Sequence, residues 1–87
     1  MIAAQRIVQG TTYVVGISRT NMGGFGIELI IHAQNYVCVI SSTNPNISNG
    51  SRILAVDGIS LEDVDIVSYL RQRPTAKLTF QKAFNDF

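Results

Sequence analysis

Residues 50–60 read GSRILAVDGIS, and this stretch is the most informative about the fold. Its first part, residues 52–56, is rich in aliphatic side chains and predicts a β-strand. Asp57-Gly58 follows directly and is a strong signal for a two-residue hairpin turn. The turn leads into Ile59-Ser60, so we expect a tight hairpin whose second arm is very short.

Three more strands are expected before this hairpin. They are rich in β-branched and aromatic residues and cover residues 11–18 (TTYVVGIS), 25–32 (FGIELIIH) and 36–42 (YVCVISS). The third is apolar on both faces, so we expect it inside the sheet rather than at an edge. Residues 43–51 are rich in turn formers and leave little room for a helix.

One helix is expected after the hairpin. Ser60 is a good N-cap residue, and residues 60–63 (SLED) resemble a capping box with Asp63 in the place of Glu or Gln. Pro74 disfavours helical backbone at the residue before it, so the helix should end near Gln72.

This helix carries two pairs of apolar residues. Ile66 and Tyr69 lie three residues apart, and so do Val67 and Leu70, on a face rotated by about 100°. One pair can line the core, while the other lies at the edge of the core or faces a groove. The alternative is one wide stripe that belongs to the core alone.

The order of the elements is typical of a small, mainly β domain with one main helix, an α+β fold. Residues 75–81 (TAKLTFQ) alternate in polarity and predict the last strand. A chain of 87 residues allows one domain. We therefore expect a single domain over residues 1–87, with its core at about residues 11–82 and flexible ends.

Composition argues against several function classes. The net charge is +1, which does not favour nucleic acid as a partner. Cys38 is the one cysteine, so an internal disulfide is excluded, and we expect it to fill the core rather than to react. His32 is the one histidine, which excludes a His-rich metal site. We expect no membrane span, no cofactor, no metal and no enzymatic activity, and a cytoplasmic location.

The segment Gly23-Gly24-Phe25-Gly26-Ile27 carries the most specific chemistry. Successive N–H groups in a glycine-rich turn can converge on one point and bind an anion. Phe25 and Ile27 alternate around Gly26, so both side chains can point into one apolar pocket. Such a site suits a carboxylate attached to a hydrophobic side chain, as at the C-terminus of a protein. From the residues alone, an ordinary glycine turn is the alternative.

In wider context the chain resembles the PDZ domain family. Residues 24–27 (GFGI) are similar to the family's carboxylate-binding loop, and residues 50–60 to its Gly-Asp-x-Ile-Leu-x-Val-Asn-Gly stretch, with Ser51 in the place of the usual Asp. The resemblance implies a partly open β-sandwich or barrel of five to six strands, capped by a helix. The family's first small helix should be reduced to a turn within residues 43–51.

The resemblance also implies a binding site for the C-terminal tail of a partner protein. The tail would add as an antiparallel strand between the second strand and the main helix. The residues implied to bind the terminal carboxylate are Gly24, Phe25, Gly26 and Ile27, helped by Arg19. The residues implied to form the pocket for the last side chain are Phe25, Ile27, Leu29, Val67 and Leu70.

Two acidic residues are candidates for ligand selectivity. Asp63 would occupy the first groove-facing position of the helix, where it can accept a hydrogen bond from a hydroxyl or favour a cation. The capping box competes for the same carboxylate. Glu28 points opposite to Ile27 on the groove strand and can reach a basic ligand residue; the alternative is a plain exposed charge.

The expected partners are C-terminal peptides with a hydrophobic last residue, and the expected role is that of a scaffold or adaptor, including one at the membrane-associated cortex through its partners. Two alternatives stay open: a regulatory PDZ domain of a larger enzyme, and a dimerisation domain that uses internal motifs. The chain ends in Phe84-Asn85-Asp86-Phe87. This tail offers a route to self-association if Phe87 enters the groove of a neighbour.

Overall fold

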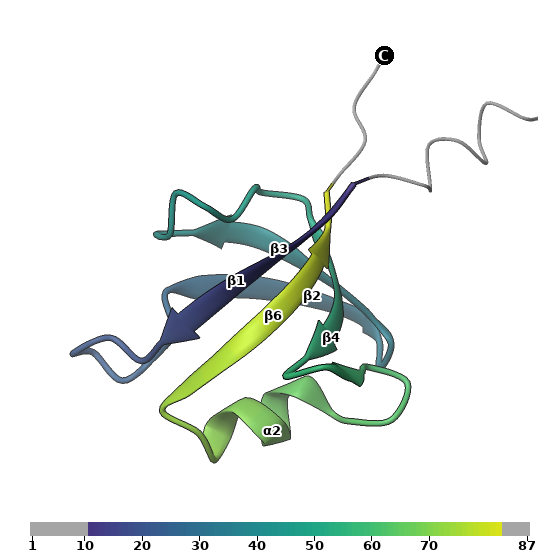
Figure 1. The fold of residues 1–87 in the computed structure, drawn as a ribbon. Helices are drawn as coiled ribbons and strands as arrows, with labels where there is room; N and C mark the ends of the chain where they lie inside the picture. The colour runs from purple at the N-terminus through teal and green to yellow at the C-terminus, as the bar shows by residue number, and fades with distance from the viewer. Residues whose placement is uncertain (1–10, 83–87) are drawn as a thin grey trace, which may run out of the picture.

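The fold consists of a six-stranded antiparallel sheet and one short helix (Figure 1). The computed structural model describes residues 11–82. The elements are β1 (Thr12–Ser18), β2 (Ile27–Ala33), β3 (Tyr36–Ser42), β4 (Arg52–Val56), β5 (Ile59–Ser60), α2 (Ile66–Arg71) and β6 (Thr75–Gln81). Each strand expected from the sequence is present, with small shifts at its ends. The predicted α+β fold class is confirmed.

The strands follow the order β1-β6-β4-β3-β2, and β5 pairs with β4. All pairs are antiparallel, and β1 and β2 stand at the two ends of this order. In the view of Figure 1, α2 lies below the strands. β3 lies between β4 and β2, as its apolar sequence predicts. Only one of its faces is fully covered, because Val37 and Val39 are buried while Tyr36 and Ile40 are exposed.

Twelve buried apolar side chains form the core among the described residues, and they come from β1, β3, β4, β6 and α2, together with Ile47 before β4 and Leu61 after β5. Phe80 and Ile53 lie fully inside it. Ile66 and Leu70, four residues apart on α2, point into the same core. Tyr69 is only partly buried and packs against this core, so the buried pair of the helix is Ile66 with Leu70 and not Ile66 with Tyr69.

The turn at Asp57-Gly58 is confirmed by its backbone angles. Asp57 has φ 50° and Gly58 has φ 81°, and a two-residue turn with positive φ at both positions matches the twist of the strands that it joins. The turn connects β4 with β5 as expected. Within residues 43–51 the structure contains no helix, which agrees with the reduced first helix.

Ser51 has a structural role in this link. The Tyr13 hydroxyl lies 2.6 Å from the Ser51 hydroxyl, and it accepts a hydrogen bond from the Ser48 N–H at 3.1 Å. The Tyr13 ring also stacks on Phe80, with 5.1 Å between ring centroids. Because Ser51 is completely buried, a carboxylate in its place would need a stronger partner than a tyrosine hydroxyl.

The start of the helix was predicted wrongly. Helix α2 begins at Ile66, and its N-cap is Asp65, whose carboxylate accepts from Val67 N–H at 3.0 Å and Ser68 N–H at 3.4 Å. Ser60 instead belongs to β5, and its hydroxyl accepts from Glu62 N–H at 3.1 Å within a turn. The predicted end of the helix at Gln72 is confirmed.

Pairing in the β4–β5 hairpin explains why α2 starts later than predicted. The Leu61 N–H donates to the Leu54 carbonyl at 3.2 Å, so the hairpin ladder continues one residue beyond β5. The Leu61 side chain is only 1% exposed and anchors this position in the core. The chain therefore cannot become helical at Leu61, and the capping box with Asp63 does not form.

Two other expectations change or lie outside the structure. Cys38 is half-buried and does not belong to the core as expected. Its partial burial raises the pKa of the thiol, and the positive charge of Arg52 acts in the opposite direction. Within residues 11–82 no helix is long and apolar enough to cross a bilayer. The predicted tail interaction through Phe87 and the two ends that were expected to be flexible lie outside the described residues.

Candidate functional site

A pocket of about 210 Å³ lies between β2 and α2. Its wall is mostly apolar and consists of Arg19, Phe25, Ile27, Leu29, Val67, Leu70, Arg71 and Leu78. All five residues predicted for the hydrophobic pocket are among them, together with Arg19. The structure thus brings together residues from the loop before β2, from β2 itself, from α2 and from β6.

The periodicities of strand and helix bring these side chains together. Ile27 and Leu29 alternate along β2 and share the face that looks toward α2. Val67 and Leu70 are three residues apart on α2 and share one side of the helix. The prediction that Val67 and Leu70 form a second apolar face is therefore supported by their place in the pocket wall, while Leu70 serves the core as well.

The loop before β2 depends on glycine at position 26. Gly26 has φ +75°, a conformation that residues with a side chain rarely adopt. A Cβ atom at this position would also collide with Thr43 Oγ1. The Thr43 N–H donates to the Gly26 carbonyl at 2.9 Å, so the loop is tied to the end of β3 at the same point.

The backbone of β2 presents its polar groups at an open edge. The Gly26 carbonyl faces β3, because it accepts from Thr43, so the groups of the next residue, Ile27, face the other way. The Val39 N–H donates to the Ser51 carbonyl, and the Val39 carbonyl accepts from the Gly50 N–H, so both groups point away from β2. Its partner Leu29 therefore also points its N–H and C=O out of the sheet. Within the described residues no strand pairs with this side of β2.

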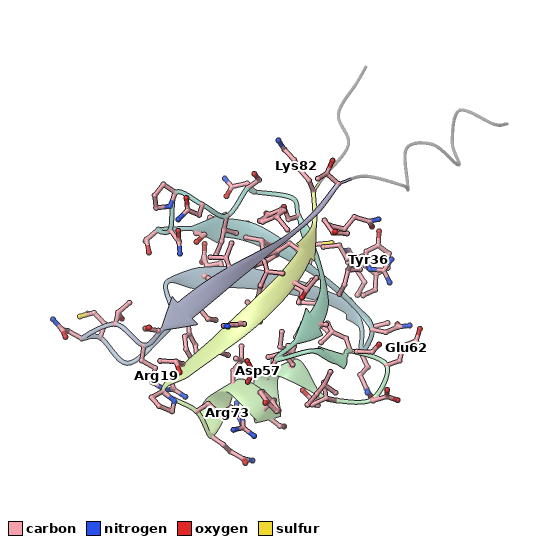
Figure 2. The ribbon with its side chains drawn as sticks, viewed as in Figure 1. Arg19, Tyr36, Asp57, Glu62, Arg73 and Lys82 are labelled. Carbon is pink, nitrogen blue, oxygen red and sulfur yellow. The ribbon has the colours of Figure 1, made fainter. Side chains whose placement is uncertain are left out.

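Arg19 connects the loop to the end of the helix. Its guanidinium donates to the carbonyls of Leu70 at 2.6 Å, Gly23 at 2.8 Å and Arg73 at 3.0 Å (Figure 2). Its Cζ atom lies 4.7 Å from the centroid of the Phe25 ring. These bonds occupy donors that the sequence suggested for a ligand carboxylate. Arg19 therefore clamps the glycine loop to the C-terminal end of α2, with its positive charge beside the pocket.

A second set of bonds holds α2 from the other side. The Asp57 carboxylate accepts from the Lys77 N–H and from the Tyr69 hydroxyl, both at 2.8 Å. These two hydrogen bonds lower the pKa of Asp57, the one from Lys77 more strongly, and the bond to Asp57 raises the pKa of the Tyr69 hydroxyl. Arg73 lies over the Tyr69 ring, with 4.0 Å from Cζ to the centroid (Figure 2). The β4–β5 turn, β6 and α2 are thus joined through one carboxylate.

The two predicted selectivity residues lie outside the pocket wall. Asp63 is exposed in the turn before α2, so it does not hold a helical position as predicted. Glu28 is exposed, and its carboxylate accepts a hydrogen bond from the Ser41 hydroxyl at 2.7 Å. Neither side chain contributes to the pocket as the structure stands.

Two residues of the pocket wall were missed. Leu78 is buried on β6, and its place on the inward face follows from the alternation of residues 75–81. Arg71 is the last residue of α2, four positions after Val67, and helical spacing places it near the same side. Both signals were available in the sequence.

Comparison with known proteins bears on the fold. No protein-family model matches the sequence, and no curated protein matches it. A solution structure of the PDZ domain from human FERM and PDZ domain containing 1 is similar, with a TM-score of 0.70 and 17% sequence identity over 90% of each chain. The chain therefore has a PDZ-like fold.

Proposed function

We propose that this chain is a protein-interaction module that binds the C-terminal tail of partner proteins between β2 and α2. The observation that carries the proposal is the outward-facing backbone of Ile27 and Leu29, which lies beside an apolar pocket. An extended peptide can pair with such an edge through main-chain hydrogen bonds, while the pocket accepts one of its side chains.

The glycine loop is the proposed site for the terminal carboxylate. The turn at Gly26 lies between Phe25 and Ile27, which both belong to the pocket wall. Consecutive N–H groups from Gly24 to Ile27 can converge on an anion there. The guanidinium of Arg19 adds positive charge beside the same loop without leaving its three carbonyl partners.

The apolar wall selects a hydrophobic last residue. Only the two arginines interrupt it, and a pocket of about 210 Å³ suits a single side chain. We expect affinities in the micromolar range, because a short strand buries little area and loses conformational freedom on binding. In this proposal the chain is not an enzyme and acts as a scaffold or adaptor in the cytoplasm.

The selectivity roles of Asp63 and Glu28 form part of the same proposal. Both carboxylates are exposed, Glu28 on β2 and Asp63 in the turn before α2, so in this proposal a longer peptide reaches them beyond the pocket. A basic residue upstream in the ligand would then be favoured over an acidic one. Exchange of either carboxylate for its amide should reduce this preference while binding of the last residue stays the same.

The test is an NMR titration of the labelled chain with peptides that end in a hydrophobic residue, each as free acid and as C-terminal amide. The proposal predicts shifts of the backbone amides of Phe25, Gly26 and Ile27, and of Val67, with the acids only. Gly26→Ala should weaken the interaction at least about tenfold, as expected for a distorted binding loop. Gly16→Ala on β1 is the matched control, because an added Cβ there meets open space. Equal shifts with acids and amides would refute recognition of the carboxylate.

A further inference from the structure

Among the described residues, β1 is the second open edge of the sheet, and the strand itself lacks the usual protection against strand pairing. It pairs with β6 along Thr12–Ser18 without a register shift, and no other described strand pairs with it. Its sequence, TYVVGIS, contains neither a charge nor a proline. Natural proteins commonly blunt exposed edges with charges, prolines or bulges. β2 has two register shifts and carries Glu28, so the two edges differ.

The polar groups that β1 leaves unpaired can be assigned from its ends. The Lys82 N–H donates to the Thr11 carbonyl at 2.8 Å, and the Arg19 N–H donates to the Pro74 carbonyl at 3.0 Å. The backbone N–H and C=O groups of residues 11 and 19 therefore point toward β6. In an antiparallel ladder every second residue between them does the same. The residues between them that face the free side are Thr12, Val14, Gly16 and Ser18.

We propose that β1 pairs with the β1 of a second copy of this chain, antiparallel and about a two-fold axis at Val15. In this register Thr12 lies opposite Ser18 of the second copy, and Val14 lies opposite Gly16. Each of these pairs joins two outward-facing residues, so each can exchange two backbone hydrogen bonds. The pairing uses the whole length of the strand, and the same patch serves both copies.

The side chains fit this register. Val14 is 60% exposed, whereas an added Cβ atom at Gly16 would meet nothing within 4 Å. A broad hollow of about 1020 Å³ runs along this face, with Val14, Gly16, Lys77 and Thr79 in its wall. The two-fold axis places Val14 of each copy over Gly16 of the other. The contact covers two exposed apolar side chains and leaves no steric conflict at the glycine.

In the proposed register, the side chains that line up across the two paired sheets are compatible as well. On the core face, Val15 stands beside Leu78, so the central row consists of aliphatic residues from both copies. On the outer face, Gly16 stands beside Lys77, and Val14 stands beside Thr79. Lys77 of one copy therefore shares a row with Thr79 of the other, and no two like charges are directly opposed. The dimer should be weak, because one strand pair lies at the small end of protein interfaces.

The test is sedimentation velocity of the 87-residue chain at about 10 µM to 1 mM, a range suited to weak association. Val14→Pro removes an N–H that has no partner within the described chain, so the fold should persist. Val14→Lys adds a charge to the row that holds Lys77 of the second copy. Ile40→Lys is the control, because Ile40 is similarly exposed at 53% on β3.

The proposal predicts dimers for the wild type and for Ile40→Lys, and at least tenfold weaker association for both Val14 variants. Amide shifts of Thr12, Val14, Gly16 and Ser18 should depend on concentration in the wild type, which decides the question even if a variant unfolds. A monomeric wild type at the highest concentration would overturn the proposal. Dimers that persist in both folded Val14 variants, or that disappear only when residues 83–87 are removed, would place the contact elsewhere.

Discussion

Replacement of Gly26 by alanine is the most informative single change in the groove. Gly26 has φ +75°, and a non-glycine residue in this region costs about 1–2 kcal/mol. The new Cβ would collide with Thr43 Oγ1, and forced displacement of packed groups costs about 1–3 kcal/mol. Alanine restricts the unfolded chain and returns about 0.4–1 kcal/mol. The net expectation is a loss of about 3 kcal/mol in the free energy of unfolding.

The two contributions can be separated in a double-mutant cycle with Thr43→Ala. This second change removes the hydroxyl that the new Cβ meets but leaves the backbone angle at position 26 unaltered. Urea unfolding of the four proteins should show that the double variant recovers about two thirds of the loss, since only the steric part is relieved. The Gly16→Ala variant should instead raise the free energy of unfolding by about 0.4–1 kcal/mol, because only the restriction of the unfolded chain applies where the new Cβ meets open space.

Peptide affinity provides the second readout of the same variants. Movement of the loop displaces the N–H groups proposed to bind the carboxylate, so Gly26→Ala should weaken binding more than its loss of stability alone requires. Fluorescence polarisation under conditions where each variant is fully folded measures this effect. If Gly26→Ala keeps the stability and the affinity of the wild type, then the positive φ and the contact with Thr43 do not constrain the loop, and our description of it is wrong.

Three further predictions concern the elements that hold the groove. Arg19→Ala should weaken peptide binding several-fold, because the loop loses its link to the end of α2, and calorimetric titration measures this; unchanged affinity would contradict the clamp. Asp65→Ala should lower the free energy of unfolding by about 1 kcal/mol in urea, whereas Ser60→Ala should matter less, since Asp65 is the cap. The pKa of Asp57 is lowered from its ordinary 3.8, so its contribution to stability is complete above that pH and is lost as the pH falls through the lower folded value. Thermal melts at a series of acidic pH values should show this loss in the wild type and a smaller one in Asp57→Asn.

Local signals in the sequence were sufficient for most of the fold. The alternating and apolar runs located the strands, and Asp57-Gly58 located the tight turn, because both features depend on a few adjacent residues. The pocket residues on β2 and α2 were named from the resemblance to PDZ domains, and the alternation of the strand and the turn of the helix explain why their side chains share a face. The end of the helix followed from Pro74, which acts on the residue before it.

Features that depend on distant contacts were not predicted. The late start of α2 results from the bond of Leu61 to Leu54 and from burial of Leu61, and the capping pattern at Ser60 gave no hint of either. The clamp by Arg19 uses carbonyls some fifty positions along the chain, so no local pattern predicts it. The half-buried state of Cys38 has a similar origin, because an apolar strand does not reveal which of its faces will be covered.

The most direct test of the central claim compares one peptide in two forms. A peptide with a hydrophobic last residue is titrated into the labelled chain first as the free acid and then as the C-terminal amide, and the amide shifts of Phe25, Gly26 and Ile27 are followed. Our account predicts saturating shifts at these residues and at Val67 with the acid, and at least about tenfold weaker binding of the amide, as expected when a charged hydrogen-bond acceptor is lost. Equal affinity for both forms, or no shift along β2 and α2 with any such peptide, would contradict it.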